Sequence, residues 1–110
     1  MEPHFLHLIY EMSPVYLYAT MKPVAGEEDF VRNAISVMAD HVRDEPGCVR
    51  FEVYELDDGT IHVEETYKDE AAFKDHMATQ HGKDFNGSIV GKVVGNGSNV
   101  VFMKSISTTL

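Results

Sequence analysis

Apolar side chains follow two different periods along this chain, and the order of those periods constrains the fold more than any other feature. Between residues 14 and 21 every second side chain is apolar, which is the period of a β-strand. A helical period follows as far as residue 43, with Gly26 as the expected N-cap and acidic residues in the first turn. The sequence therefore predicts a strand and then an amphipathic helix. The predicted apolar face of that helix consists of Phe30, Ala34, Met38 and Val42, supported by Val31, Ile35 and Val37.

The rest of the chain continues this alternation after Pro46 and Gly47, which end the helix. In the next strand Val49 and Phe51 are expected to share one face. The segments expected are strands over residues 48–56 and 60–68, a helix capped by Asp69 that ends near residues 79–82, a short helix over 83–92 and a last strand over 100–106. The order strand, helix, strand, strand, helix, strand predicts an α+β fold of the ferredoxin-like, split βαβ type, with an antiparallel sheet and helices on one face.

The length of 110 residues is that of one domain. We expect residues 14–110 to form it, preceded by an N-terminal extension over residues 1–13 that acts as an added strand or as an arm onto a partner subunit. A single helical layer leaves the other face of the sheet bare. Three tyrosines, Tyr16, Tyr18 and Tyr54, are expected on that face. A bare face with aromatic side chains predicts a homodimer; the alternative is that the extension covers this face within one chain.

The charge balance excludes some partners. Nine Lys and Arg residues against 18 Asp and Glu residues give a net charge of −9, which opposes binding to nucleic acid and to anionic membranes. The N-terminal apolar run is too short to span a bilayer and lacks the basic region of a secretory signal. The single cysteine, Cys48, cannot form an intramolecular disulfide, so we expect a cytoplasmic protein. We interpret Cys48 as a small buried side chain, and a nucleophilic thiol is the alternative.

The first candidate for chemistry is Glu65. On the third predicted strand it shares a face with Ile61, Val63 and Tyr67, and that face is expected to meet the helices. Burial of a carboxylate among apolar side chains should raise its pKa, which is a property of acid–base residues in clefts. The alternatives are a structural ion pair and a shift of register at the end of the strand.

The second candidate is His76, which falls on the predicted apolar face of the second helix together with Phe73. The strand that carries Glu65 leads directly into this helix, so both side chains can line one cavity between sheet and helix. A carboxylate beside an imidazole is a usual arrangement for a general base. His81 is expected near the mouth of the same cavity. The alternative for His76 is a hydrogen-bonded residue of the core.

Metal binding is the rival use of the six histidines. His76 and His81 do not have the helical separation that places two ligands side by side, and the sequence has neither paired cysteines nor an HExxH motif. His4 and His7, in the extension, could bind metal only adventitiously. We therefore predict no metal site. No glycine-rich phosphate loop follows a predicted strand either.

Two runs of the sequence resemble one known family. The first is Asp44–Val53, and the second is Glu65–Phe73 followed by His76 and by Ala78–His81. In this order they resemble the antibiotic biosynthesis monooxygenase family over residues 14–106. The resemblance implies a dimeric α+β barrel of ferredoxin-like subunits, with a pocket between each sheet and its helices. It also implies that Glu65, His76 and His81 match recurrent pocket residues.

The resemblance carries expectations about activity. Some members of this family are cofactor-free monooxygenases of quinols or polyphenolic aromatics, and a related branch processes the phosphorylated signal autoinducer-2. We therefore expect a small aromatic substrate, dioxygen and no cofactor, with Glu65 and His76 as catalytic residues. The expected substrate-binding residues are His81, Tyr67, Phe51 and Phe73.

Two departures from the family pattern bear on the substrate. The chain has no Trp, and Tyr67 stands where many relatives have one, which argues against haem degradation. Gly82 replaces an aromatic residue that often follows the second histidine. Two other functions stay open. One is a non-oxidative enzyme for a small phosphorylated metabolite, whose phosphate would need Arg50 or Lys104; the other is a non-catalytic dimer that binds a small molecule.

Overall fold

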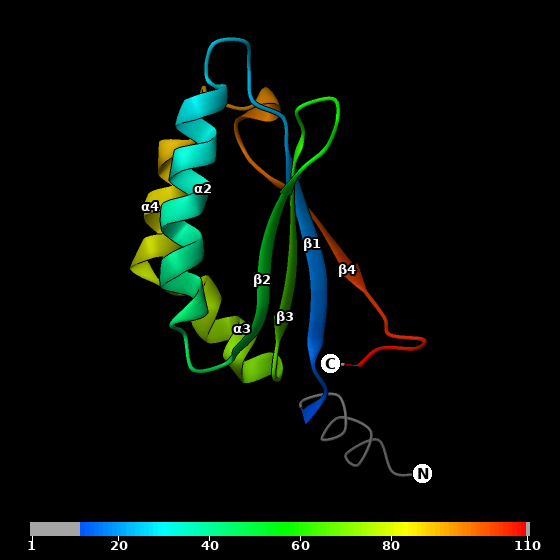
Figure 1. The fold of residues 1–110 in the computed structure, drawn as a ribbon. Coiled ribbons are helices and arrows are strands. Elements are labelled where there is room, and N and C mark those ends of the chain that lie inside the picture. The colour runs from blue at the N-terminus through cyan, green and yellow to red at the C-terminus, as the bar shows by residue number, and fades with distance from the viewer. Residues whose placement is uncertain (1–11, 110) are drawn as a thin grey trace.

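The structure is a computed structural model that describes residues 12–109, so the predicted extension over residues 1–13 lies almost wholly outside the described residues. Within that range one antiparallel sheet of four strands is covered by helices on one side (Figure 1). The strands are β1 (Val15–Met21), β2 (Cys48–Glu55), β3 (Ile61–Tyr67) and β4 (Asn99–Met103). Their spatial order is β2-β3-β1-β4. This arrangement confirms the predicted ferredoxin-like α+β fold.

The helices form the second layer. They are α2 (Glu28–Arg43), α3 (Glu70–Met77), α4 (Gln80–Ser88) and the short 3₁₀ helix η1 (Val94–Asn96). α2 packs against β2 and against α4. The core lies between this layer and the sheet, and its fully buried members include Val31, Val42, Val63, Ile89 and Val93. Among residues 12–109, none of the helices is both long enough and apolar enough to cross a membrane.

The buried face of α2 differs in part from the predicted apolar face. The helix buries Val31, Ile35, Ala39 and Val42, whereas Phe30 is exposed. Val31, Ile35 and Val42 are thus buried as predicted, and Ala34 and Met38 pack partly buried against the core. Phe30 and Val37 are exposed instead, because they line a groove between α2 and α4 that covers them only in part. The N-cap is also Glu27 rather than Gly26, whose positive φ of 91° places it in the turn before the helix.

A β-bulge changes the predicted alternation of β2. Cys48 pairs with Tyr67 and Arg50 pairs with Thr66, so Val49 is the extra residue of β2. Val49 is therefore exposed, and the prediction that it shares the face of buried Phe51 is wrong. Cys48 packs against the core instead, and burial raises the pKa of its thiol to about 11. A protonated, partly buried thiol supports the interpretation of Cys48 as a small packing residue rather than a nucleophile.

The three C-terminal elements α3, α4 and β4 end earlier than predicted. Asp69 caps α3 as expected, because its carboxylate accepts a hydrogen bond from the backbone N–H of Ala72. The helix ends at Met77, however, and the Thr79 hydroxyl then caps α4 by accepting from the N–H of Gly82. The predicted helix over 83–92 is thus α4, over Gln80–Ser88, and the last strand ends at Met103 rather than at residue 106.

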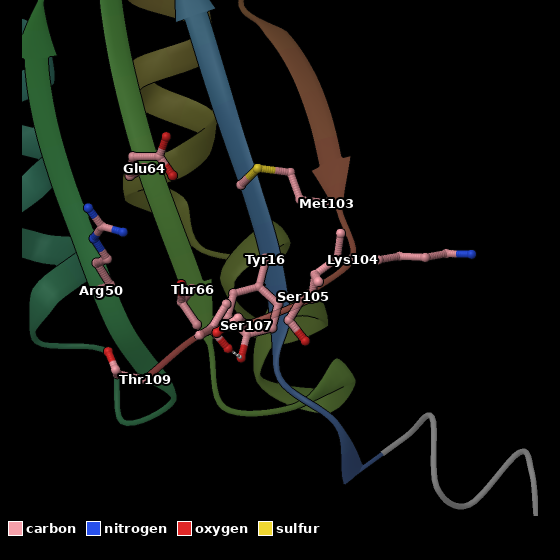
Figure 2. Close-up of a pocket in the computed structure, with 11 residues that line it drawn as sticks. Tyr16, Arg50, Glu64, Thr66, Met103, Lys104, Ser105, Ser107 and Thr109 are labelled. Atoms are coloured by element: carbon pink, nitrogen blue, oxygen red, sulfur yellow. Dashed lines mark hydrogen bonds between the residues drawn. The ribbon is translucent and has the colours of Figure 1, made fainter.

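The outer face of the sheet, opposite the helices, carries the expected tyrosines. Tyr18 stacks on His62 with ring centroids 5.0 Å apart, and Tyr54 is 48% exposed. Residues 104–109 pass across part of this face, where the Tyr16 hydroxyl lies 3.3 Å from the Thr108 hydroxyl (Figure 2). The segment and the strands enclose a hollow of about 560 Å³. The C-terminal segment therefore covers one end of the outer face, and no described residue covers the Tyr54 end.

Candidate active site

A cavity of about 420 Å³ lies between the sheet and the helices. This volume is in the usual range for a small-molecule pocket. Its apolar wall includes both predicted aromatic residues, Phe51 and Phe73, and Phe73 packs edge-on against Phe102 with ring centroids 5.5 Å apart. Its polar side chains are Glu65, His76, Asn86 and Ser98. The structure thus brings Glu65 and His76 to one cavity, as the sequence predicts.

Glu65 faces the cavity because of its register in the sheet. Its cross-strand neighbours are Leu17 on β1 and Phe51 on β2, both buried on the inner face. Only 7% of Glu65 is exposed. This burial raises the pKa of the carboxyl above its usual value of 4.5, while a hydrogen bond from Tyr67 and the charge of His76 act in the opposite direction. The carboxylate is therefore a stronger proton acceptor than one in water.

Tyr67 holds the carboxylate of Glu65 in place by a hydrogen bond. Its hydroxyl donates a hydrogen bond of 2.7 Å to Oε1 of Glu65, two residues earlier on the same face of β3. Burial and the neighbouring carboxylate raise the pKa of the phenol well above its ordinary range, so Tyr67 keeps its proton. Tyr67 is fully buried and is not among the residues that line the cavity. It positions Glu65 rather than lying in the cavity wall.

His76 lies between the carboxylates of Glu45 and Glu65. On α3 its Nδ1 atom lies 3.1 Å from Oε1 and 3.0 Å from Oε2 of Glu45. A carboxylate accepts hydrogen bonds and donates none, so in a neutral ring Nδ1 carries the proton and Nε2 is free to accept one. That Nε2 atom lies 3.7 Å from Oε1 of Glu65. The geometry leaves His76 ready to accept a proton beside the cavity.

Glu45 is the residue that the sequence reasoning missed. It lies between α2 and β2, its side chain is 12% exposed, and it also accepts a hydrogen bond of 2.6 Å from Nε2 of His81. No periodicity marks Glu45, because it lies outside the regular elements. The only available signal was its place inside the run Asp44–Val53. Glu45 is therefore not among the predicted site residues.

His81 does not lie where the sequence reasoning expected it. It lines the groove between α2 and α4 instead of the cavity mouth, and its ring stacks on His41 with centroids 5.5 Å apart. Its side chain is 24% exposed. A continuous line of polar groups therefore runs from Tyr67 and Glu65 through His76 and Glu45 to His81 at the surface. Every buried side-chain nitrogen or oxygen among the described residues has a hydrogen-bond partner.

The cavity offers no positive charge apart from a protonated histidine. Among the described residues that line it there is neither a lysine nor an arginine. Arg50 and Lys104 instead line the hollow on the outer face of the sheet (Figure 2). The cavity therefore suits an uncharged, largely apolar molecule with a group that can lose a proton.

The fold and the cavity define a small ferredoxin-like α+β protein with an acid–base pair between sheet and helices. The sequence model of the family described as antibiotic biosynthesis monooxygenase matches residues 14–88. The chain belongs to this family.

Solved structures share the fold. That of Rv0793 from Mycobacterium tuberculosis has a TM-score of 0.81 at 23% sequence identity and covers 89% of this chain and 100% of that one. The structure of PA3566 from Pseudomonas aeruginosa has a TM-score of 0.79 at 18% sequence identity, and the match covers 88% of this chain and 98% of that one. A structure described as an antibiotic biosynthesis monooxygenase has a TM-score of 0.76 at 21% sequence identity, and the match covers 84% of this chain and 99% of that one. No curated protein sequence matches this chain.

Proposed function

We propose that this protein is a cofactor-independent monooxygenase that oxidises a small quinol or polyphenolic aromatic. The observation that carries the proposal is the position of Glu65 and His76 on one wall of an otherwise largely apolar cavity of about 420 Å³. Membership of the antibiotic biosynthesis monooxygenase family supports it. We assign this function to the domain of residues 14–110.

Proton removal is the first step of the proposed reaction. A substrate hydroxyl near Nε2 of His76 gives up its proton, with Glu45 on the Nδ1 side and Glu65 at 3.7 Å stabilising the imidazolium that forms. When the substrate is bound, apolar side chains take the place of water around its ring, so the phenolate is poorly solvated and electron-rich. The hydrogen bond between Glu45 and His81 then gives the proton a route to solvent, because His81 is partly exposed.

Oxygen chemistry follows on the deprotonated ring. The phenolate transfers one electron to dioxygen, and the aryloxyl radical and superoxide combine to form a carbon–oxygen bond. Protonation of the resulting peroxide allows the O–O bond to break, which releases water and leaves a quinone. A hydroquinone and dioxygen thus give a hydroxyquinone and one water, with the organic substrate as the only reductant. The protein supplies the base, the orientation and the dry cavity.

A phosphorylated metabolite is a weaker candidate as substrate. A phosphate group would need a cation at the cavity, and Arg50 and Lys104 lie at the outer face instead. A non-catalytic dimer that binds a small molecule is the remaining alternative, and the activity assay described below tests it.

We propose a homodimer as the working unit, formed through the outer face of the sheet. Tyr54 and Val101 are exposed on that face, and Ile106 of the C-terminal segment is fully exposed beside it. Apolar side chains gathered on the uncovered side of a two-layer domain favour burial against a second copy. The two cavities would then face outward, on the helical sides of the dimer.

The experiment is oxygen uptake by chelator-treated protein with a panel of dihydroxyarenes. We expect uptake above the uncatalysed rate, reduced about 10²- to 10⁴-fold in Glu65→Gln and in His76→Ala. His62→Ala is the matched control, since His62 also bonds a carboxylate, that of Glu64, but on the outer face. Unchanged uptake in His76→Ala would show that the assignment of the base is wrong, and unchanged uptake in Glu65→Gln would show that Glu65 does not stabilise the imidazolium. Ligand binding without uptake across the panel would favour the non-catalytic alternative.

A further inference from the structure

We propose that Glu45, His76 and His81 form a binding site for a divalent transition-metal ion such as Zn²⁺. Each residue offers one ligand atom, and these atoms all lie within 4.8 Å of one another. The spacing of His76 and His81 disfavours a metal site only where both ligands lie on a single helix. The fold brings the two histidines together from consecutive helices, α3 and α4, onto a carboxylate that precedes β2.

The distances suit an ion with small adjustments. Oε2 of Glu45 lies 3.0 Å from Nδ1 of His76 and 2.6 Å from Nε2 of His81. Zinc binds such atoms at about 2.0–2.2 Å, so ligand atoms around a tetrahedral ion are about 3.3 Å apart. Each nitrogen–oxygen separation therefore needs to lengthen by less than about 1 Å, and the two ring nitrogens, which lie within 4.8 Å of each other, need to move to about the same separation. The ion would take the place of the two N–H protons that now lie between the rings and the carboxylate.

The donor set selects the type of ion. Two imidazole nitrogens and one carboxylate oxygen suit Zn²⁺, Co²⁺ and Fe²⁺, whereas Ca²⁺ and Mg²⁺ prefer sites built of oxygen ligands alone. Three protein ligands also leave a coordination position open for water or another small ligand.

The surroundings of the site resemble those of bound metals. With His76 attached through Nδ1, its Nε2–H faces the carboxylate of Glu65 at 3.7 Å. A metal-bound histidine usually donates its second N–H to a carboxylate, which fixes the orientation of the ring. A shift of under about 1 Å would bring this pair to hydrogen-bond distance. The His81 ring is held from its other side by stacking on His41. Both rings are therefore already held in place before an ion binds.

An ion can reach the site from solvent. The side chain of His81 is 24% exposed, whereas those of Glu45 and His76 are nearly buried. The opening thus lies in the groove between α2 and α4 rather than in the substrate cavity. Metal ion and aromatic substrate would approach His76 from opposite sides.

The inference does not depend on the proposed function, because metal binding is measured without substrate. It has one consequence for turnover. A ring that is bound to metal through Nδ1 keeps its proton on Nε2 and cannot accept another. Saturating Zn²⁺ is therefore expected to reduce any oxygen uptake that relies on His76.

The test is a calorimetric titration of Zn²⁺ into the chelator-treated full-length chain, with Co²⁺ absorption spectra to report the coordination. His4 and His7 are both replaced by Ala in every sample, so that neither can supply a second site. We expect one ion per chain, with affinity reduced at least about tenfold in His81→Ala and in Glu45→Gln. His62→Ala, whose imidazole bonds a single carboxylate on the outer face, is expected to bind as the parent does.

Two results would overturn the inference. One is equal Zn²⁺ affinity in the parent and in His81→Ala; the other is the absence of saturable binding in the parent. Circular dichroism checks that each variant is folded. If Glu45→Gln does not fold, His81→Ala decides the question, since its side chain is the most exposed of the three.

Discussion

The Nε2 atom of His76 on α3 lies 3.7 Å from the Oε1 atom of Glu65 on β3. That separation is too long for a good hydrogen bond but short enough for a charge interaction. The two groups therefore do not hydrogen-bond to each other, and a substrate hydroxyl can bond to either of them. Glu65 and His76 are held instead from outside the pair, by Tyr67 and Glu45 respectively.

Replacement of Glu65 by Gln should alter the pH dependence of stability. Burial holds the pKa of Glu65 above 4.5, so the folded state binds this proton more tightly than the unfolded state does. The contribution of Glu65 to stability is thus full below the unfolded pKa and is lost as the pH rises through the folded pKa. Glu65→Gln avoids this loss and keeps Tyr67, His76 and Glu45 around the site.

Thermal unfolding from about pH 4 to about pH 8 measures this effect. We expect the melting temperature of Glu65→Gln, relative to the parent, to increase with pH. Glu52→Gln, which changes a half-exposed carboxylate on the outer face, is the control and should show no such trend. A relative melting temperature that falls with increasing pH would contradict the assigned direction of the Glu65 pKa.

Loss of the Tyr67 hydroxyl should shift the activity profile. In Tyr67→Phe the carboxylate of Glu65 loses its 2.7 Å hydrogen bond, which holds its pKa down against burial. The pKa of Glu65 should rise further, so the acid limb of kcat/KM should move to higher pH. Stability at neutral pH should fall by about 1–3 kcal/mol, because a buried acceptor loses its donor.

The pH profile separates this role from a merely structural one. Tyr18→Phe is the matched control, since Tyr18 stacks on His62 on the outer face, away from the cavity. It should leave the acid limb in place. An acid limb that is unchanged in Tyr67→Phe would show that Tyr67 has no effect on the ionisation of Glu65 during turnover.

Gly47 allows the close approach that places Glu45 over α3. A Cβ atom at Gly47 would lie 2.2 Å from the Cβ of Ala72, well inside van der Waals contact. Gly47→Ala should therefore destabilise the protein by about 1–3 kcal/mol in urea unfolding. Gly87→Ala is the control, because a Cβ there meets nothing within 4 Å, and in α4 it should stabilise by up to about 1 kcal/mol. Equal effects of the two substitutions would refute this account of Gly47.

The proposed dimer predicts twice the mass of one chain in light scattering. Val101 is exposed beside Tyr18 on the outer face, so Val101→Glu would bury a charge in the interface and should give monomers. Val37→Glu adds the same charge on the exposed side of α2 and should leave the mass unchanged. A parent protein that is monomeric at all concentrations would contradict the dimer.

Much of the fold follows from local patterns in the sequence. The alternation of Ile61, Val63 and Glu65 places the carboxylate on the inner face, and Asp69 marks the start of α3. The failures arise from contacts with other segments. The bulge at Val49 depends on the pairing of β2 with β3, and the apolar stripe of α2 depends on where α4 packs. Neither partner is visible from one segment alone.

The missed part of the site arises from contacts between distant segments. Glu45 meets His76 across 31 residues and His81 across 36, and it belongs to no periodic element. The two histidines also fall on separate helices, because Thr79 begins a new one between them. Spacing rules for a single helix therefore could not find this cluster, although each of its residues is evident in the sequence.

The most direct test of the central claim is the fate of isotopically labelled dioxygen during turnover of an active dihydroxyarene. Products are trapped by rapid reduction to the quinol, because quinone oxygens exchange with water. The proposed reaction predicts one labelled oxygen atom in the ring product and no accumulation of hydrogen peroxide. It also predicts that labelled product forms about 10²- to 10⁴-fold more slowly in Glu65→Gln. An unlabelled quinone with one equivalent of hydrogen peroxide would show an oxidase, and would contradict the account.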